Sequence, residues 1–297
     1  MSTERARGVE RERGAAAAQR APDAERARAR HLYYRARLQR LLGRGARAAE
    51  LCRRALDQAD YTRAYELLSN MELPGEHYLR VLARVHALVR PATYVEIGVA
   101  AGKSLALLGA HTDAIGIDPA PRLPHAPGPR QRLFAETSDE FFARHDLKAE
   151  LAGRALTMAF IDGMHHFEFA LRDFLNLERF CAPGSLIFVH DCYPIDERSA
   201  AREQSTAFWS GDVWRLIVLL KRHRPDLSIQ TLGVPPTGLG LITRLDPESQ
   251  LAQSLPALIE EGLALPYESI AARKADALNL MPYDWGQVRA LVQAAHT

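Results

Sequence analysis

Features that would place this chain in a specialised class are scarce or missing. Its 297 residues include only three cysteines, at positions 52, 181 and 192, which are too few and too scattered for a disulfide framework or a zinc knuckle. No apolar run approaches the roughly 20 residues that a membrane span needs, and the N-terminus lacks the apolar stretch of a signal peptide. A formal net charge of +2 gives no general reason to expect nucleic acid as a partner. These absences predict a cytoplasmic protein that binds neither membranes nor nucleic acid.

Composition and hydrophobic spacing divide the sequence into four segments. Residues 1–28 are mostly Arg, Ala and Glu with almost no large apolar side chains, which predicts a disordered tail. Residues 29–89 carry apolar side chains at helical spacing and predict a helical N-terminal extension. Strand and helix patterns alternate over 90–245, and 246–297 is expected to be helical again. With 47% hydrophobic residues, a chain of this length can bury one large core and a smaller accessory unit.

The alternating segment predicts a doubly wound α/β fold. Strands are expected at 93–98, 114–117, 132–135, 157–161 and 185–190, with helices between most of them. The strand near residue 185 is a continuous apolar run, which is typical of a strand buried on both faces. Residues 227–234 and 239–244 then indicate two more strands, joined by a proline-glycine turn.

The most informative stretch of the sequence is residues 94–104, YVEIGVAAGKS. It predicts a buried strand, a glycine turn and then a helix that starts near Lys103. Glu96, Gly98 and Gly102 form the pattern E-x-G-x-x-x-G, in which small residues let the backbone approach a ligand closely. A helix that begins there would also point its unpaired N–H groups at the ligand.

Acidic and imidazole side chains follow the other central strands. The second strand ends in Asp118, where a carboxylate can accept hydrogen bonds from both hydroxyls of a ribose. Asp162 and His165 follow the fourth strand, and His190 and Asp191 end the fifth. Doubly wound sheets bind their ligands at the carboxyl ends of their strands, so these groups are expected to gather along one edge of the sheet.

The glycine pattern followed by a strand that ends in Asp118 resembles the opening motif of class I S-adenosylmethionine (SAM)-dependent methyltransferases. Residues from about 90 to 245 resemble a small-molecule O-methyltransferase of that class. The Asp-Gly-x-His segment at 162–165 is similar to that of bacterial families acting on macrolide sugars and other natural products, and catechol O-methyltransferases look more distant. The resemblance implies a Rossmann-like seven-stranded sheet with an antiparallel last strand, SAM as cofactor, and a small-molecule hydroxyl as acceptor.

The resemblance also implies which residues bind SAM. Glu96 would bind the methionine amino group, directly or through water, and Asp118 would hold the ribose. Ser138 and Asp139 lie just past the third strand, where relatives place a serine and a polar residue on the adenine. The implied cofactor-binding set is Glu96, Gly98, Gly102, Ser104, Asp118, Ser138, Asp139 and Asp162.

In catechol-type enzymes the aspartate after strand four binds a divalent metal, and a lysine three positions later is the base. Asp162 matches that aspartate and His165 falls at the base position, so the implied catalytic residues are His165, Asp162 and His190. A histidine pKa near 6.5 would suit His165 to take a proton from a hydroxyl. The implied metal site is Asp162, His190 and Asp191. Mg²⁺, a softer ion such as Mn²⁺ or Zn²⁺, and no metal all remain open, because hard cations prefer oxygen ligands to imidazole.

Other functions and an assembly state also remain open. Asp162, His165 and His190 can be read as a two-histidine, one-carboxylate site for Fe(II) and oxygen chemistry, as in a hydroxylase. The domain can also be read as a non-catalytic binding module. Residues 31–70 carry more apolar side chains than one short helix against a sheet needs, which predicts a homo-oligomer, most simply a two-fold dimer. In such a dimer these residues would cover the substrate side of the sheet or the partner subunit.

Overall fold

The computed structural model describes residues 23–295 of the chain. The described residues form two compact units, of which the first comprises residues 23–71 together with Thr206–Phe208, and the second comprises Glu72–Ser205 and residues 209–295. Most of the expected tail lies outside the described residues. Its last part, residues 23–28, is helical, because it continues into the helix that follows it.

The first unit is made of helices, as expected for the N-terminal extension. Residues 23–41 are helical, and α2 (Gly45–Leu56) and α3 (Thr62–Glu72) follow. Leu51 and Cys52 of α2 are buried, as the helical spacing of apolar residues predicts. Tyr65 of α3 stacks on Phe208, with ring centroids 5.1 Å apart, so the short segment 206–208 completes this unit.

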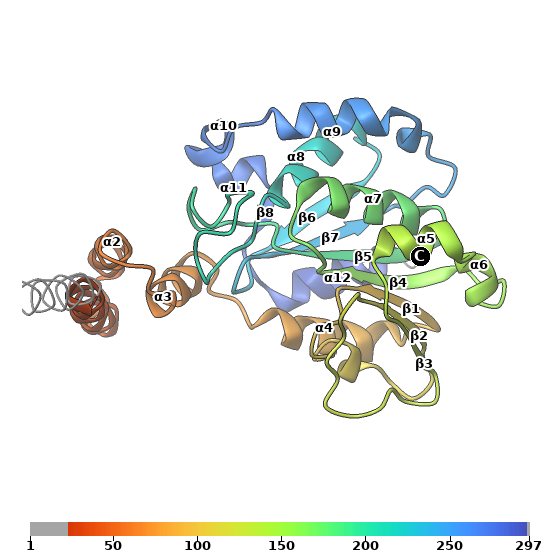
Figure 1. Cartoon of the computed structure of the whole chain (residues 1–297), viewed down its shortest axis with the longest axis horizontal. Helices are drawn as coiled ribbons and strands as arrows, with labels where there is room; N and C mark the ends of the chain where they lie inside the picture. The colour runs from red at the N-terminus through yellow and green to blue at the C-terminus, as the bar shows by residue number, and fades with distance from the viewer. Residues whose placement is uncertain (1–22, 296–297) are drawn as a thin grey trace, which may run out of the picture. The chain divides into compact units, whose positions relative to one another are not determined.

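The second unit is built on a mixed eight-stranded sheet with the strand order β3-β2-β1-β4-β5-β7-β6-β8 (Figure 1). Its strands are β1 (Thr93–Ile97), β2 (Asp113–Ile117), β3 (Gln131–Phe134), β4 (Leu156–Ile161), β5 (Cys181–His190), β6 (Ser228–Leu232), β7 (Leu239–Thr243) and β8 (Leu280–Met281). Strands β1 to β5 pair in parallel, whereas β7 is antiparallel to both β5 and β6. The predicted Rossmann-like seven-stranded sheet is confirmed. The two-residue β8, which pairs with β6, is an additional strand that the sequence does not predict.

Alternate residues of the central strands point into two separate cores. On β4, Ala159 and Ile161 belong to one core, and Met158 and Phe160 belong to the other. Helices α7 (Phe167–Glu178), α8 (Trp214–His223) and α9 (Leu255–Leu263) contribute to the first core, and α4 (Tyr78–Val89) and α12 (Trp285–Ala295) to the second (Figure 1). Helix α4 therefore belongs to the sheet's own unit, although the sequence places it in the extension 29–89. Likewise, α12 extends the unit beyond the expected limit at residue 245.

Short elements complete the second unit. They are η1 (Leu105–Leu107), α5 (Ser138–Arg144), α6 (Leu147–Glu150), η2 (Leu251–Ser254), α10 (Glu268–Ala271) and α11 (Lys274–Ala277). The expectation of a helix starting near Lys103 is wrong, because only the single turn η1 forms before the chain becomes extended at Leu108. A single turn carries no helix dipole of consequence, so the glycine turn acts without a helix N-terminus behind it. No helix within residues 23–295 combines the length and apolar character needed to cross a membrane.

Candidate active site

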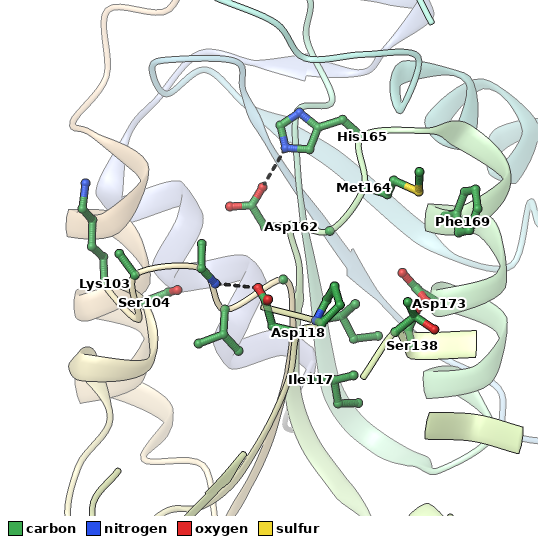
Figure 2. Close-up of a pocket in the computed structure, with 18 of the residues that line it drawn as sticks. Lys103, Ser104, Ile117, Asp118, Ser138, Asp162, Met164, His165, Phe169 and Asp173 are labelled. Atoms are coloured by element: carbon green, nitrogen blue, oxygen red, sulfur yellow. Dashed lines mark hydrogen bonds and ion pairs between the residues drawn. The ribbon is translucent and has the colours of Figure 1, made fainter. Parts of the chain in front are cut away.

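A cavity of about 640 Å³ lies at the carboxyl ends of β1, β2 and β4 (Figure 2). The strand order reverses between β1 and β4, and this switch point is where open α/β sheets bind their ligands. The volume is within the range of small-molecule sites. Six of the residues expected at the site line it, namely Gly98, Ser104, Asp118, Ser138, Asp162 and His165.

The glycine turn brings the end of β1 against the end of β4. Gly98 has a φ of 86°, and a Cβ at this position would lie 1.9 Å from the carbonyl oxygen of Asp162. Only glycine therefore allows the two chain segments to approach this closely. Gly102, with a φ of 68°, closes the turn by donating its N–H to the Val99 carbonyl at 2.7 Å, but it does not line the cavity.

Asp118 holds this turn in place. Its carboxylate accepts hydrogen bonds from the backbone N–H groups of Ala100 and Ala120, both at 2.7 Å, and Figure 2 shows the first of them. The side chain also lines the cavity, as the ribose-binding prediction requires. Asp118 thus couples the shape of the glycine turn to the surface that faces a ligand.

Glu96 lies beneath the cavity rather than in its wall. It is fully buried, and its carboxylate accepts hydrogen bonds from the hydroxyls of Tyr94 at 2.7 Å and Ser104 at 2.6 Å. Burial raises the pKa of Glu96 to about 7, although these two hydrogen bonds oppose the shift. Because Ser104 lines the cavity and Glu96 does not, Glu96 acts on the site through Ser104. A direct contact from Glu96 to a methionine amino group stays a prediction.

The two residues expected at the adenine differ in position. Ser138 lines the cavity at the first turn of α5, next to the N-cap Thr137. Asp139 is not among the lining residues, and its carboxylate pairs with Arg172 through hydrogen bonds of 2.8 and 2.7 Å. The structure therefore places Ser138, and not Asp139, where the prediction needs it.

Two carboxylates, of Asp162 and Asp191, and two imidazoles, of His165 and His190, lie close together at the carboxyl ends of β4 and β5. The Nε2 of His165 lies 3.1 Å from Asp191 Oδ2 and 3.6 Å from Asp162 Oδ1 (the latter contact is drawn in Figure 2). Its Nδ1 donates to the carbonyl of Trp209 at 3.3 Å. His190 directs Nδ1 toward the same carboxylates, at 3.3 Å from Asp162 and 3.1 Å from Asp191. The predicted gathering of these four residues is present.

The charges of this cluster are strongly coupled. Burial opposes protonation of both imidazoles, but the carboxylates of Asp191 and Asp162 outweigh it and raise the pKa of His165 to about 9 and that of His190 well above its usual range. Burial also disfavours the charged form of Asp162, yet His190 and His165 hold the pKa of that carboxyl far below its ordinary value. The pKa near 6.5 expected for His165 is therefore wrong for this arrangement.

The residues that can hold a metal differ from the expected set. Asp162, His165 and Asp191 each offer one ligand atom, and these atoms all lie within 4.8 Å of one another. His190 is not part of that group, although its Nδ1 lies near both carboxylates; its ring packs on Tyr78 with centroids 4.2 Å apart, and its Nε2 is buried without a partner among the described residues. His165 and Asp191 both have positive φ, at 56° and 61°. Such strained backbone is typical of functional sites.

Other residues at the cavity were missed by sequence reasoning. They are Tyr78, Lys103, Met164, Phe169 and Asp173. The position of Asp173 could have been recognised from the sequence. It falls three residues after Ala170 and four before Leu177, on the apolar face of α7. An acid on that face needs a partner or a ligand.

Comparison with known proteins identifies the central segment. Residues 95–192, from β1 to just past β5, match the family described as a methyltransferase domain. The chain contains a methyltransferase domain. This match confirms the class of enzyme predicted from the glycine motif, and the matched segment includes Asp118 and the whole acid–imidazole cluster.

Solved structures similar to the methyltransferase domain are distant in sequence. One is the O-methyltransferase from Bacillus cereus in complex with SAH, which is 14% identical, with 59% of this chain and 86% of that chain covered and a TM-score of 0.43. Another is the O-methyltransferase TomG from Streptomyces achromogenes in complex with SAM, which is 16% identical, with 56% of this chain and 78% of that chain covered and a TM-score of 0.43. A search of the curated proteins finds no match to the sequence.

Proposed function

We propose that this methyltransferase uses SAM to methylate a hydroxyl group of a small molecule, such as a sugar or another natural product. One observation carries the proposal: a single cavity combines the glycine turn and Asp118 with Asp162 and His165. Methyl transfer needs donor and acceptor side by side, and a cavity with two chemically different parts provides for both.

The part of the cavity around Asp118 suits SAM. Asp118 offers its carboxylate to the ribose, Ser104 and Ser138 add hydroxyls, and Ile117 and Val99 are apolar lining residues. When bound, SAM supplies an electrophilic methyl group on a sulfonium, so the protein mainly has to align the acceptor and manage its proton.

His165 is the residue that we assign to the acceptor's proton. Its Nδ1 is engaged with the Trp209 carbonyl, which leaves Nε2 to exchange protons. Nε2 faces the carboxylates of Asp191 and Asp162, which stabilise the imidazolium and raise the pKa of His165 to about 9, so His165 has to lose a proton before Nε2 can accept one from the hydroxyl. The same carboxylates favour retention of that proton, so it must be discharged before the next turnover.

A divalent cation at Asp162, His165 and Asp191 is a second way to activate the same hydroxyl. The donor set fits such an ion, since two carboxylates and one imidazole converge within 4.8 Å. Mixed oxygen and nitrogen ligands favour Mn²⁺ or a softer ion over Mg²⁺. Bound there, the ion would lower the pKa of the acceptor hydroxyl. The two roles exclude each other, because Nε2 of His165 cannot ligate an ion and accept a proton at once.

The alternative of a non-haem hydroxylase receives less support from this arrangement. That chemistry uses two histidines and one carboxylate, whereas the converging group holds one histidine and two carboxylates. A non-catalytic binding module would bind SAM without producing a methylated compound. Product analysis therefore separates all three functions.

Calorimetry with SAH and a product screen test the proposal. The wild type should bind SAH in the micromolar range, about −8 kcal/mol, and Asp118→Ala should lose about 1.5–3 kcal/mol of it. Because both oxygens of Asp118 accept backbone hydrogen bonds, circular dichroism and urea denaturation of Asp118→Ala are the control for loosening of the glycine turn. No binding by the wild type would contradict the proposal.

Mass spectrometry of hydroxylated natural products incubated with SAM should then reveal a methylated product. With that substrate, His165→Ala should lower kcat by about 10²–10⁴-fold while SAH affinity stays nearly unchanged. Normal turnover by this variant would remove His165 from both the base and the metal-ligand roles. Oxygen consumption without methylation would instead favour the hydroxylase.

A further inference from the structure

Asp173 is a buried carboxyl group that the proposed chemistry does not use. It lies on α7, only 2% of its surface is exposed, and it lines the cavity. Figure 2 shows it beside Ser138, in the part of the cavity near Ile117 and Asp118 and apart from His165 and Asp162. Asp173 therefore lies next to the expected position of the methyl donor SAM and away from that of the methyl acceptor.

The hydrogen bonding of Asp173 is incomplete. Ser138 donates to the carboxyl group, but Oδ1 has no partner within residues 23–295. The neighbouring Arg172 is bonded to Asp139 and lies over the Phe169 ring, 4.4 Å from its centroid. Burial consequently raises the pKa of Asp173 to about 7. A buried acceptor without a donor is costly, so a ligand that donates to Oδ1 would remove a penalty already present in the protein.

The surroundings of Asp173 select the kind of donor. Ile117, Met164 and Phe169 line the same cavity with apolar and aromatic surface, which suits a flat ring better than a flexible polar chain. A ribose held at Asp118 places an attached base in this part of the site. In an adenine attached to a ribose, the exocyclic amino group is the only N–H donor, because the ring nitrogens not bonded to the ribose are acceptors.

We propose that Asp173 accepts a hydrogen bond from the exocyclic amino group of the adenine in bound SAM and thereby selects adenine over bases with a carbonyl at that position. This inference rests on the proposed function. A carbonyl in place of the amino group would set one acceptor against another in a buried site, and sites built around one hydrogen bond reject such analogues strongly. Asp139, the acid expected there from the sequence, is occupied by Arg172 and serves as the comparison.

Calorimetry with SAH and its deaminated analogue, S-inosylhomocysteine, tests the inference. At pH about 8.5, where the Asp173 carboxyl is ionised, the wild type should bind SAH about 10- to 100-fold more tightly than the inosyl compound. Asp173→Asn should lose most of this preference, because the amide can also donate to a carbonyl. Asp139→Asn, the same substitution in a neighbouring acid, should keep it.

The outcomes separate this inference from the proposed function. A wild type that binds SAH and the inosyl compound equally overturns the role of Asp173 and leaves methyl transfer standing, and this measurement needs no variant to fold. A preference that persists in Asp173→Asn, shown to be folded by circular dichroism, overturns it as well. A wild type that binds neither compound overturns both.

Discussion

Replacing Gly98 with alanine tests whether the glycine turn is required by the packing of two strand ends. A Cβ at this position would lie 1.9 Å from the carbonyl oxygen of Asp162, 2.4 Å from its carbonyl carbon and 2.8 Å from the Cα of Gly163. All three are backbone atoms that follow β4, so no side-chain rotation relieves the overlap. Relief requires the segment that carries Asp162 to move away from β1.

The expected loss of stability has two parts. A left-handed backbone conformation costs an L-residue roughly 1–2 kcal/mol, and overpacking of a close contact costs about 1–3 kcal/mol more. We therefore expect Gly98→Ala to lower the free energy of unfolding by about 2–5 kcal/mol. Gly153→Ala is the matched control, because Gly153 has a similar φ of 75° but nothing within 4 Å of its Cβ position. The Gly153→Ala variant should lose only the roughly 1–2 kcal/mol of stability that the left-handed backbone conformation costs.

Urea denaturation of the two variants and the wild type measures both values. SAH binding by any folded Gly98→Ala protein should also weaken, since Asp162 and the floor of the cavity must shift together. Equal losses in the two variants would refute the reasoning. In that case the backbone conformation alone would require glycine at position 98, and the close approach of β1 and β4 would be relieved at no cost.

Further predictions concern pH, metal and assembly. The raised pKa of Asp173 means that the folded state keeps a proton the unfolded state has lost between pH about 4 and 7, so stability should fall as pH rises through that window. Urea melts should show Asp173→Asn reducing this fall by up to about 4 kcal/mol, and identical pH profiles would contradict the assignment. If a cation at Asp162, His165 and Asp191 activates the acceptor, excess EDTA should abolish turnover and Mn²⁺ should restore it; full activity in chelator would leave only the base role for His165. Tyr34, Leu38 and Leu41 of the helix 23–41 and Leu42 just after it are exposed large apolar residues, with Leu41 81% exposed, so we expect a dimer in light scattering that Leu41→Glu converts to monomer. A wild-type monomer would contradict this.

Much of the fold could be predicted because its strands are apolar runs of ordinary length bounded by turns. The two-residue β8 has no periodicity to detect, and its neighbours read as helix. Helix α4 shows a clear apolar stripe, but a stripe does not say which core it enters. The helix expected after the glycine turn has good local propensity, yet the chain leaves it after η1, so tertiary context outweighs propensity there.

The site was predictable to the extent that topology determines it. Parallel strands bring their carboxyl ends to one edge, so acids at the ends of β2, β4 and β5 had to lie close together. The orientation of a ring or carboxyl group is a different matter. His165 and His190 are equivalent in the sequence pattern, but His165 lines the cavity, whereas the His190 ring is buried against Tyr78 and reaches the two carboxylates only through Nδ1. Likewise, Asp139 is an exposed acid bonded to Arg172, whereas Asp173 is buried and lines the cavity.

Three acids at or beneath the cavity show how partners determine the role of a carboxyl group. Glu96 has a hydroxyl donor on each oxygen, so it needs nothing from a ligand and acts as support for Ser104. Asp162 faces two imidazoles, which keep it ionised and suit it to a cation or to an imidazolium formed in catalysis. Asp173 alone among the three keeps a buried oxygen without a donor in the described chain. Because that deficit can be removed only by a ligand, Asp173 is the acid whose energy should change most when the cavity fills.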